Sequence, residues 1–114
     1  MKNKFMEQAL KEANKARLKD EVPVGCVIVK GDKIIARGHN TKENTINAVN
    51  HAEIVTLQKA YKKLKSWRLE DCEMYVTLEP CIMCTGAIVH SRIKKIYLVL
   101  KILKLEQLCQ RHSY

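Results

Sequence analysis

Apolar positions recur along this chain with two periods, and their alternation predicts an α/β fold. Residues 4–19 carry apolar side chains mostly three or four positions apart, which predicts an amphipathic helix with lysines on its outer face. The β-branched run at 25–30, a turn, and the run at 33–37 predict a hairpin. Later runs predict a helix, a strand, a helix and a fourth strand at 51–64, 73–78, 80–91 and 94–100. Helices that alternate with strands indicate a sheet with helices packed on its faces.

Two irregular stretches separate these elements. Val22-Pro23 ends the first helix, because the residue before a proline avoids helical backbone geometry. A longer polar loop runs from Gly38 through Asn40 to Asn50. Its length and polarity suit a binding loop at the mouth of a site, and they suit an ordinary surface loop equally well.

Length and composition indicate one small domain. The 114 residues and 46% hydrophobic content are ordinary for a globular protein. No apolar run approaches the length of a membrane span and no signal peptide is present, so we expect no membrane contact. The odd count of 5 cysteines does not suit a disulfide framework and favours the cytoplasm. The net charge of +9 suits an RNA or DNA partner, although a merely solvated lysine-rich surface gives the same charge.

The candidate chemistry lies in two short motifs, each at the start of a predicted helix. His51-x-Glu53 is followed at a distance by Pro80-Cys81-x-x-Cys84, which is the signature of zinc nucleobase deaminases. Two thiolates and one imidazole hold Zn²⁺ and leave the fourth tetrahedral position open for water, as in catalytic zinc sites. Zinc-bound water has a pKa near ~7, and Glu53 is then placed to shuttle protons.

Spacing within the second motif fits a shared site. Cys81 and Cys84 lie on one face of a helix, and Pro80 suits its first turn, where the missing N–H costs nothing. A helix N-terminus also favours the thiolate form of cysteine. Taken alone, Cys-x-x-Cys is equally consistent with a redox pair or with half of a structural zinc site.

The first motif requires a particular helix start. His51 and Glu53 are two residues apart, so they converge only if His51 stands at the helix entrance, before regular geometry begins. A plainer interpretation is that Asn50 caps the helix and Glu53 completes a capping box. We expect the cap and the chemistry together, since one residue can serve both.

The two motifs belong to a longer series of matching stretches, EVPVG at 21–25, GHN at 38–40, HAEI at 51–54 and YVTLEPCIMCTGAIVHSRI at 75–93. On these stretches, residues 4–97 resemble the bacterial tRNA-specific adenosine deaminases, a branch of the cytidine-deaminase-like superfamily. The zinc motif by itself points only to the superfamily. The resemblance implies a three-layer α/β fold, with a mixed central sheet and helices on both faces.

The same resemblance implies an activity, partners and site residues. The activity is hydrolytic conversion of adenosine to inosine at the anticodon wobble position of tRNA, by a homodimer that binds the anticodon arm. The implied zinc ligands are His51, Cys81 and Cys84, with Glu53 as the proton shuttle. The implied substrate contacts are Asn40 on the flipped base, the backbone of Ala52, and the pocket-lining Val22, Pro23 and Val24. Core packing of the valines and a turn role for the asparagine stay open as plainer interpretations.

From Leu98 onward the chain departs from the family. Family members continue with a stretch like Gly-Ala-x-Asp-x-Lys-Thr-Gly-Ala, whereas residues 98–114 are rich in leucine and lysine. Permitted codons read in another frame give Gly-Ala-Lys-Asp-Pro-Lys-Thr-Gly-Ala at this place. We therefore expect the tail to be a frameshift product, with an ordinary amphipathic helix as the plainer interpretation.

This departure divides the chain into a deaminase core, 1–97, and a segment of the same domain, 98–114, that holds the end of the fourth strand and the divergent tail. We expect a C-terminally truncated fold whose fourth strand is an unguarded edge. We also expect zinc binding to survive and tRNA turnover to be poor.

Two other functions stay open. One is deamination of free cytidine, deoxycytidylate or guanine, which the zinc motif alone does not distinguish. The other is an inactive, zinc-stabilised RNA-binding or scaffold remnant. A zinc ribbon is disfavoured, because a second Cys-x-x-Cys or a His-x-x-x-His partner is absent from the sequence.

Overall fold

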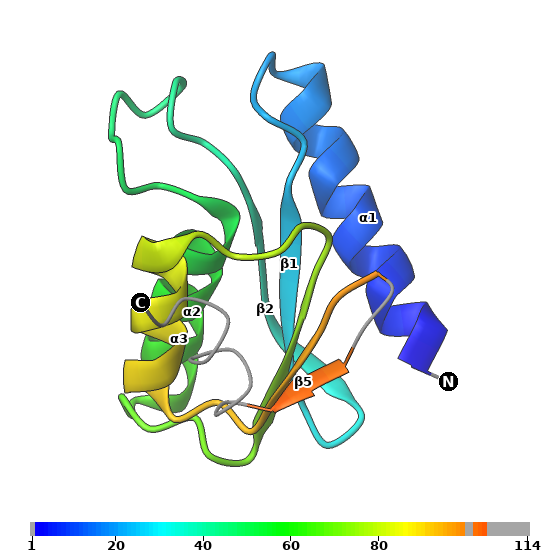
Figure 1. Ribbon diagram of the computed structural model, residues 1–114, viewed down its shortest axis with the longest axis vertical. Coiled ribbons are helices and arrows are strands. Elements are labelled where there is room, and N and C mark those ends of the chain that lie inside the picture. Colours follow the sequence, from blue (N-terminus) through cyan, green and yellow to red (C-terminus); the bar gives the residue numbers. More distant parts are fainter. Residues whose placement is uncertain (1, 100–101, 105–114) are drawn as a thin grey trace.

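The computed structural model describes residues 2–99 and 102–104, and their backbone forms three layers (Figure 1). A mixed sheet lies between α1 on one face and α2 and α3 on the other. The predicted α/β class and layering are confirmed. The elements are α1 (Lys2–Leu18), β1 (Gly25–Lys30), β2 (Lys33–His39), α2 (Ala52–Leu64), β3 (Cys72–Val76), α3 (Ile82–Ser91), β4 (Lys95–Tyr97) and β5 (Ile102–Lys104).

The sheet brings the two irregular stretches of the sequence together. Its described strands run in the order β2-β1-β3-β4-β5, parallel between β3 and β4 and antiparallel elsewhere. The β1–β2 hairpin turns at Gly31, whose φ of 64° costs a glycine little. Gly25 then pairs with His39, so Val24 and Asn40 stand side by side at the end of the hairpin. The Asn40 N–H donates to the Val24 carbonyl at 3.2 Å.

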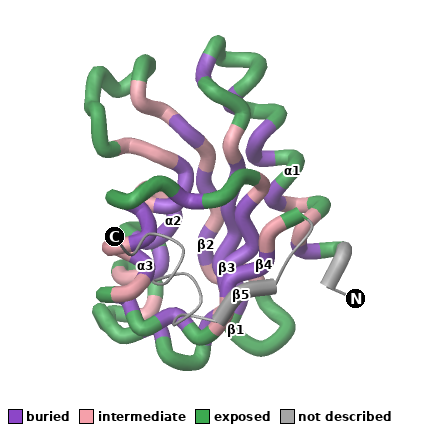
Figure 2. The backbone as a smooth tube through the Cα atoms, in the orientation of Figure 1, coloured by how far each residue is buried: buried purple, intermediate pink, exposed green. Residues whose placement is uncertain are grey.

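Alternate residues of β1 serve the two faces of the sheet. Val27 and Val29 pack beneath α1 in a small cluster that includes Tyr75 of β3. Cys26 and Ile28 pack beneath α2 and α3 in a larger cluster. All of these side chains are buried, as Figure 2 shows for the central strands. Because both faces are covered, β1 lies at the centre of the hydrophobic core.

The helices are amphipathic. In α1 the buried residues include Phe5, Ala9 and Ala13 at helical spacing, while Leu10 and Leu18 are exposed although the pattern placed them with the apolar set. Across residues 2–99 and 102–104, no helix has the length and apolar character needed to cross a membrane.

The C-terminal edge of the sheet differs from the prediction. β4 is shorter than the predicted strand 94–100, and β5 pairs with it antiparallel. The prediction of an unguarded edge at the fourth strand is therefore wrong, because the divergent tail itself supplies the covering strand. The amphipathic-helix interpretation fails at 102–104 for the same reason. The rest of that tail, 100–101 and 105–114, lies outside the described residues.

Candidate active site

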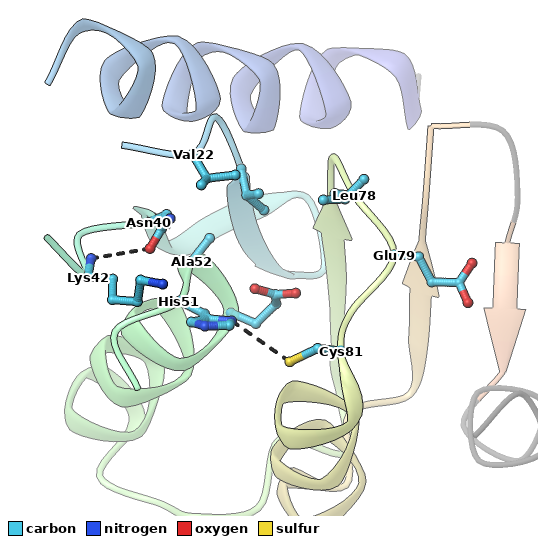
Figure 3. A pocket seen from close by; sticks show the side chains of 10 residues that line it. Val22, Asn40, Lys42, His51, Ala52, Leu78, Glu79 and Cys81 are labelled. Carbon is cyan, nitrogen blue, oxygen red and sulfur yellow. Dashed lines mark hydrogen bonds between the residues drawn. The ribbon is translucent and has the colours of Figure 1, made fainter. Parts of the chain in front are cut away.

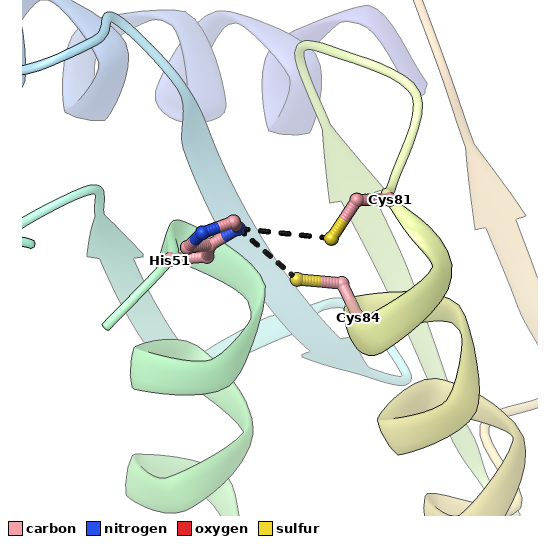
Figure 4. A group of neighbouring side chains, drawn as sticks. All are labelled: His51, Cys81 and Cys84. Carbon is pink, nitrogen blue, oxygen red and sulfur yellow. Dashed lines mark hydrogen bonds between the residues drawn. The ribbon is translucent and has the colours of Figure 1, made fainter. Parts of the chain in front are cut away.

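The three predicted metal ligands meet in space although they come from two helices (Figure 4). His51 immediately precedes α2, Cys81 immediately precedes α3, and Cys84 lies in the first turn of α3. The Nδ1 atom of His51 lies 3.8 Å from Sγ of Cys81 and 3.6 Å from Sγ of Cys84. One ligand atom of each residue lies within 4.8 Å of the other two.

This donor set fits Zn²⁺ in kind and in spacing. Tetrahedral nitrogen and sulfur ligands at their usual bond lengths to zinc lie roughly 3.6 Å apart. The measured separations of 3.6 and 3.8 Å agree with that value. Two cysteines and one histidine leave a fourth position open, which is the arrangement of catalytic zinc sites.

Both helices begin at a ligand. His51 has extended backbone geometry (φ −71°, ψ 157°), as does Cys81 (φ −74°, ψ 177°), and neither side chain caps its helix. The predicted helix-entrance position of His51 is confirmed. The predicted Asn50 cap is wrong, because its side-chain amide donates to Thr45 Oγ1 at 2.8 Å. Pro80 likewise lies before the α3 cap and not in the first turn. Non-helical backbone at the two caps lets the ligand side chains turn toward each other.

Glu53 is buried beside this cluster, with 4% of its surface exposed. Burial raises the pKa of its carboxyl, although its own backbone N–H and the Cys84 thiol donate hydrogen bonds to it. Burial also raises the pKa of the Cys84 thiol, and the negative charges of Glu53 and Cys81 add to that effect. A bound cation reverses the thiol preference, since coordinating thiols are deprotonated. A carboxylate with a raised pKa beside a metal suits proton transfer near neutral pH.

A pocket of about 200 Å³ opens beside His51 and Cys81 (Figure 3). We call it the base pocket, after the nucleobase contacts that the resemblance implies for part of its lining. Of the residues for which the resemblance implies substrate contacts, all but one line it. Pro23 is exposed and lies outside the lining, whereas its neighbours Val22 and Val24 line the pocket. The lining contacts are Val22, Val24, Asn40 and Ala52.

Three further lining residues were not predicted. Lys42 follows Asn40 by two positions, and its backbone N–H donates to Asn40 Oδ1 at 3.2 Å. Leu78 and Glu79 line the pocket from the connection between β3 and the cysteine motif. The carboxylate of Glu79 points away from the ligands in Figure 3. Leu78 is 58% exposed and lies after β3, although the pattern placed it at the end of the third predicted strand, 73–78.

Family comparison agrees with the site. The family described as the cytidine and deoxycytidylate deaminase zinc-binding region matches residues 1–100. This chain belongs to that family. The predicted zinc cofactor is thereby confirmed, and the cluster of His51, Cys81 and Cys84 lies inside the matched region.

Individual relatives support the resemblance to the tRNA branch. The tRNA-specific adenosine deaminase of Bacillus subtilis (strain 168) is 50% identical over 92 residues, which cover 81% of this chain and 57% of the relative. That of Aquifex aeolicus (strain VF5) is 48% identical over 95 residues, covering 83% of this chain and 63% of the relative. This chain thus spans little more than half the length of these curated relatives.

Solved structures share the fold. A chain from a study of A-to-I editing by tRNA:A34 deaminases superposes with a TM-score of 0.83 at 42% identity, covering 85% of this chain and 75% of that one. The guanine deaminase of Bacillus subtilis superposes with a TM-score of 0.82 at 36% identity, covering 85% and 62%. The predicted cytidine-deaminase-like architecture is confirmed.

Proposed function

We propose that this chain converts adenosine to inosine at the wobble position of a tRNA anticodon, by zinc-dependent hydrolysis that releases ammonia. The proposal rests on the cluster of His51, Cys81 and Cys84 beside the buried Glu53. It is supported by about 50% identity to tRNA-specific adenosine deaminases. The net charge of +9 suits the phosphates of an RNA substrate.

Each polar residue of the site then has a role. His51, Cys81 and Cys84 hold the zinc, which when bound supplies a water of lowered pKa. Glu53 would accept a proton from the attacking water at its carboxylate and return it to the departing amine. The burial that raises the pKa of Glu53 brings it closer to the range in which both transfers are easy.

The rest of the base-pocket lining holds the substrate. The side-chain amide of Asn40 and the backbone of Ala52 orient the base, while Val22 and Val24 cover its apolar faces. Pro23 is exposed, so a contact from it falls on the nucleotide outside the pocket.

The partner we propose is the anticodon arm of a tRNA in the cytoplasm, bound by a homodimer. Two large apolar side chains, Ile82 and Met83, are exposed at the start of α3, and we propose that they take part in the dimer contact. Light scattering should give twice the 13.2 kDa mass of one chain. A mass of one chain at micromolar concentration contradicts the homodimer.

The decisive experiment offers the zinc-loaded protein an anticodon stem-loop with adenosine at the wobble position. We expect inosine from the parent and none from Glu53→Ala. The variant should still hold zinc, because Glu53 is not in the ligand cluster. Absence of inosine from a zinc-loaded parent contradicts the proposal.

Guanine deamination is the second candidate, because the guanine deaminase of Bacillus subtilis matches this fold with a TM-score of 0.82. Free guanine, cytidine and deoxycytidylate belong in the same assay. If the protein deaminates free guanine and forms no inosine in the stem-loop, the result favours guanine deamination. RNA binding that persists in Glu53→Ala, with no product from any substrate, favours an inactive RNA-binding remnant.

A further inference from the structure

The loop 41–50 borders the base pocket through Lys42, yet residues 43–49 are exposed. The loop is closed on itself, since the Thr41 N–H donates to the Asn50 carbonyl at 3.0 Å. An exposed loop that bonds mainly to itself needs an attachment to the body of the protein to hold its pocket-facing end in one place.

Glu21 provides that attachment. Its carboxylate is buried, with 5% of the residue exposed. Oε1 accepts the Glu43 N–H at 3.0 Å, and Oε2 accepts the backbone N–H and the side-chain amide of Asn44, each at 2.6 Å. The Asn44 amide also donates to the Lys19 carbonyl at 3.1 Å. Burial raises the pKa of Glu21, but these hydrogen bonds outweigh it and leave the pKa below its ordinary value.

The attachment lies directly behind the wall of the base pocket. A second cavity, of about 540 Å³, is lined by Glu21 and Asn44. It shares Val22, Asn40 and Lys42 with the base pocket. Glu21 therefore holds the loop beside the three residues that the two cavities share.

We propose that Glu21 is a positioning residue that fixes this wall for the substrate base, by clamping residues 43 and 44 to the connection that follows α1. The inference rests on the proposed function and deepens it. Glu21 does not line the base pocket, so it acts on the substrate through the loop and not by contact.

A carboxylate is required here, because all three groups that face Glu21 are N–H donors. In Glu21→Gln one acceptor oxygen becomes an NH₂ donor. One amide orientation sets that donor against the Glu43 N–H, and the other sets it against both donors of Asn44. The clamp therefore opens on one side, while the size of the side chain is unchanged.

The test compares Glu21→Gln with Glu43→Gln. The control, Glu43→Gln, also removes one negative charge, but from an exposed side chain of the loop 41–50. Only the backbone N–H of Glu43 bonds to Glu21, so this change leaves the clamp intact. Zinc content and amide hydrogen exchange at residues 43 and 44 are measured for both variants. The dissociation constant of an anticodon stem-loop is measured in a Glu53→Ala background, and KM and kcat in the active one.

We expect Glu21→Gln to keep its zinc and to lose protection at both amides. Kd and KM should rise roughly tenfold, because binding must then order the loosened wall. The kcat should stay within about threefold, since lost uniform binding appears in KM. Glu43→Gln should match the parent throughout.

Several results overturn the inference. The inference is wrong if Glu21→Gln and Glu43→Gln show equal amide protection at residues 43 and 44. It is also wrong if the two variants have equal Kd and KM values. Loss of zinc, or a fall in kcat at constant KM, also overturns it, since Glu21 then acts through the metal cluster. If the parent forms no inosine, only the proposed function fails. The inference about Glu21 is still tested, because amide exchange and Kd are measured without turnover.

Discussion

The two sides of the base pocket are built in different ways. The zinc side carries its groups at helix entrances, where Cys84 is 0% and Glu53 4% exposed while Cys81 is exposed. The opposite side is made of connections between elements, where Val22 is 56% exposed and Lys42 is half-buried. Packing of α2 and α3 fixes the first side, whereas hydrogen bonds to Glu21 and Val24 fix the second. Changes on the zinc side should therefore abolish chemistry, and changes on the opposite side should weaken substrate fit.

The largest effect is expected from Cys84→Ser. A serine hydroxyl does not ionise as a thiol does, so the cluster loses a zinc ligand and deamination falls below detection. Zinc content by mass spectrometry and thermal unfolding should show loss of the metal and of its stabilisation. Cys72→Ala is the control, because Cys72 is buried in the core away from the cluster and its loss leaves the ligands intact. Full zinc content in Cys84→Ser contradicts the ligand assignment.

The second-largest effect is expected from Glu53→Gln. The amide keeps the shape of the side chain but cannot accept and return a proton, so kcat should fall roughly 10²- to 10⁴-fold. Zinc content and KM should stay near the parent values, because the residue is neither in the ligand cluster nor on the opposite wall. Single-turnover inosine formation with metal analysis tests this. An unchanged kcat removes Glu53 from the mechanism.

Asn40→Ala tests the opposite wall. The change removes the proposed base contact and the acceptor for the Lys42 N–H, so kcat/KM should fall roughly tenfold to a hundredfold. Asn47→Ala is the matched control, since Asn47 is an exposed asparagine of the same loop. Zinc should be retained in both. Equal kinetics for the two variants rule out a special role for Asn40.

The smallest effect is expected from Val22→Ala. Its side chain is already 56% exposed, so a rise in KM of only about two- to fivefold should follow the loss of two methyl groups. The thermal midpoint should hardly move. Val24→Ala should lower the midpoint more, because Val24 also packs against the larger core cluster. A large loss of stability in Val22→Ala shows that core packing, and not substrate contact, is its role.

Much of the fold followed from local pattern. The helices and the β1–β2 hairpin lie close to their predicted ranges, because their periodicity depends on neighbouring residues. The cap at His51 was missed, because the Asn50 side chain bonds to Thr45 instead of to the helix. β5 was missed because its pairing partner, β4, and not its own composition, makes it a strand.

In the candidate site, too, local sequence pattern predicted some residues and contacts between distant segments placed the others. His51, Glu53, Cys81 and Cys84 were predicted from residue type and short spacing, whereas Lys42 was not. The polar loop around Lys42 suited a binding loop at the mouth of a site, but it did not single out Lys42. Its place depends on the loop that Glu21 holds from more than 20 positions away.

By itself, the sequence determined the metal-binding donor set of this protein, because two cysteines and a histidine in this pattern specify zinc, and it predicted Glu53 as the proton carrier. Only the tertiary structure decided that His51 Nδ1 stands 3.6 and 3.8 Å from the two sulfurs, and which side chains face them across the pocket. The physical reason is that 30 residues separate His51 from Cys81. Their approach depends on two helices packing against the same face of one sheet.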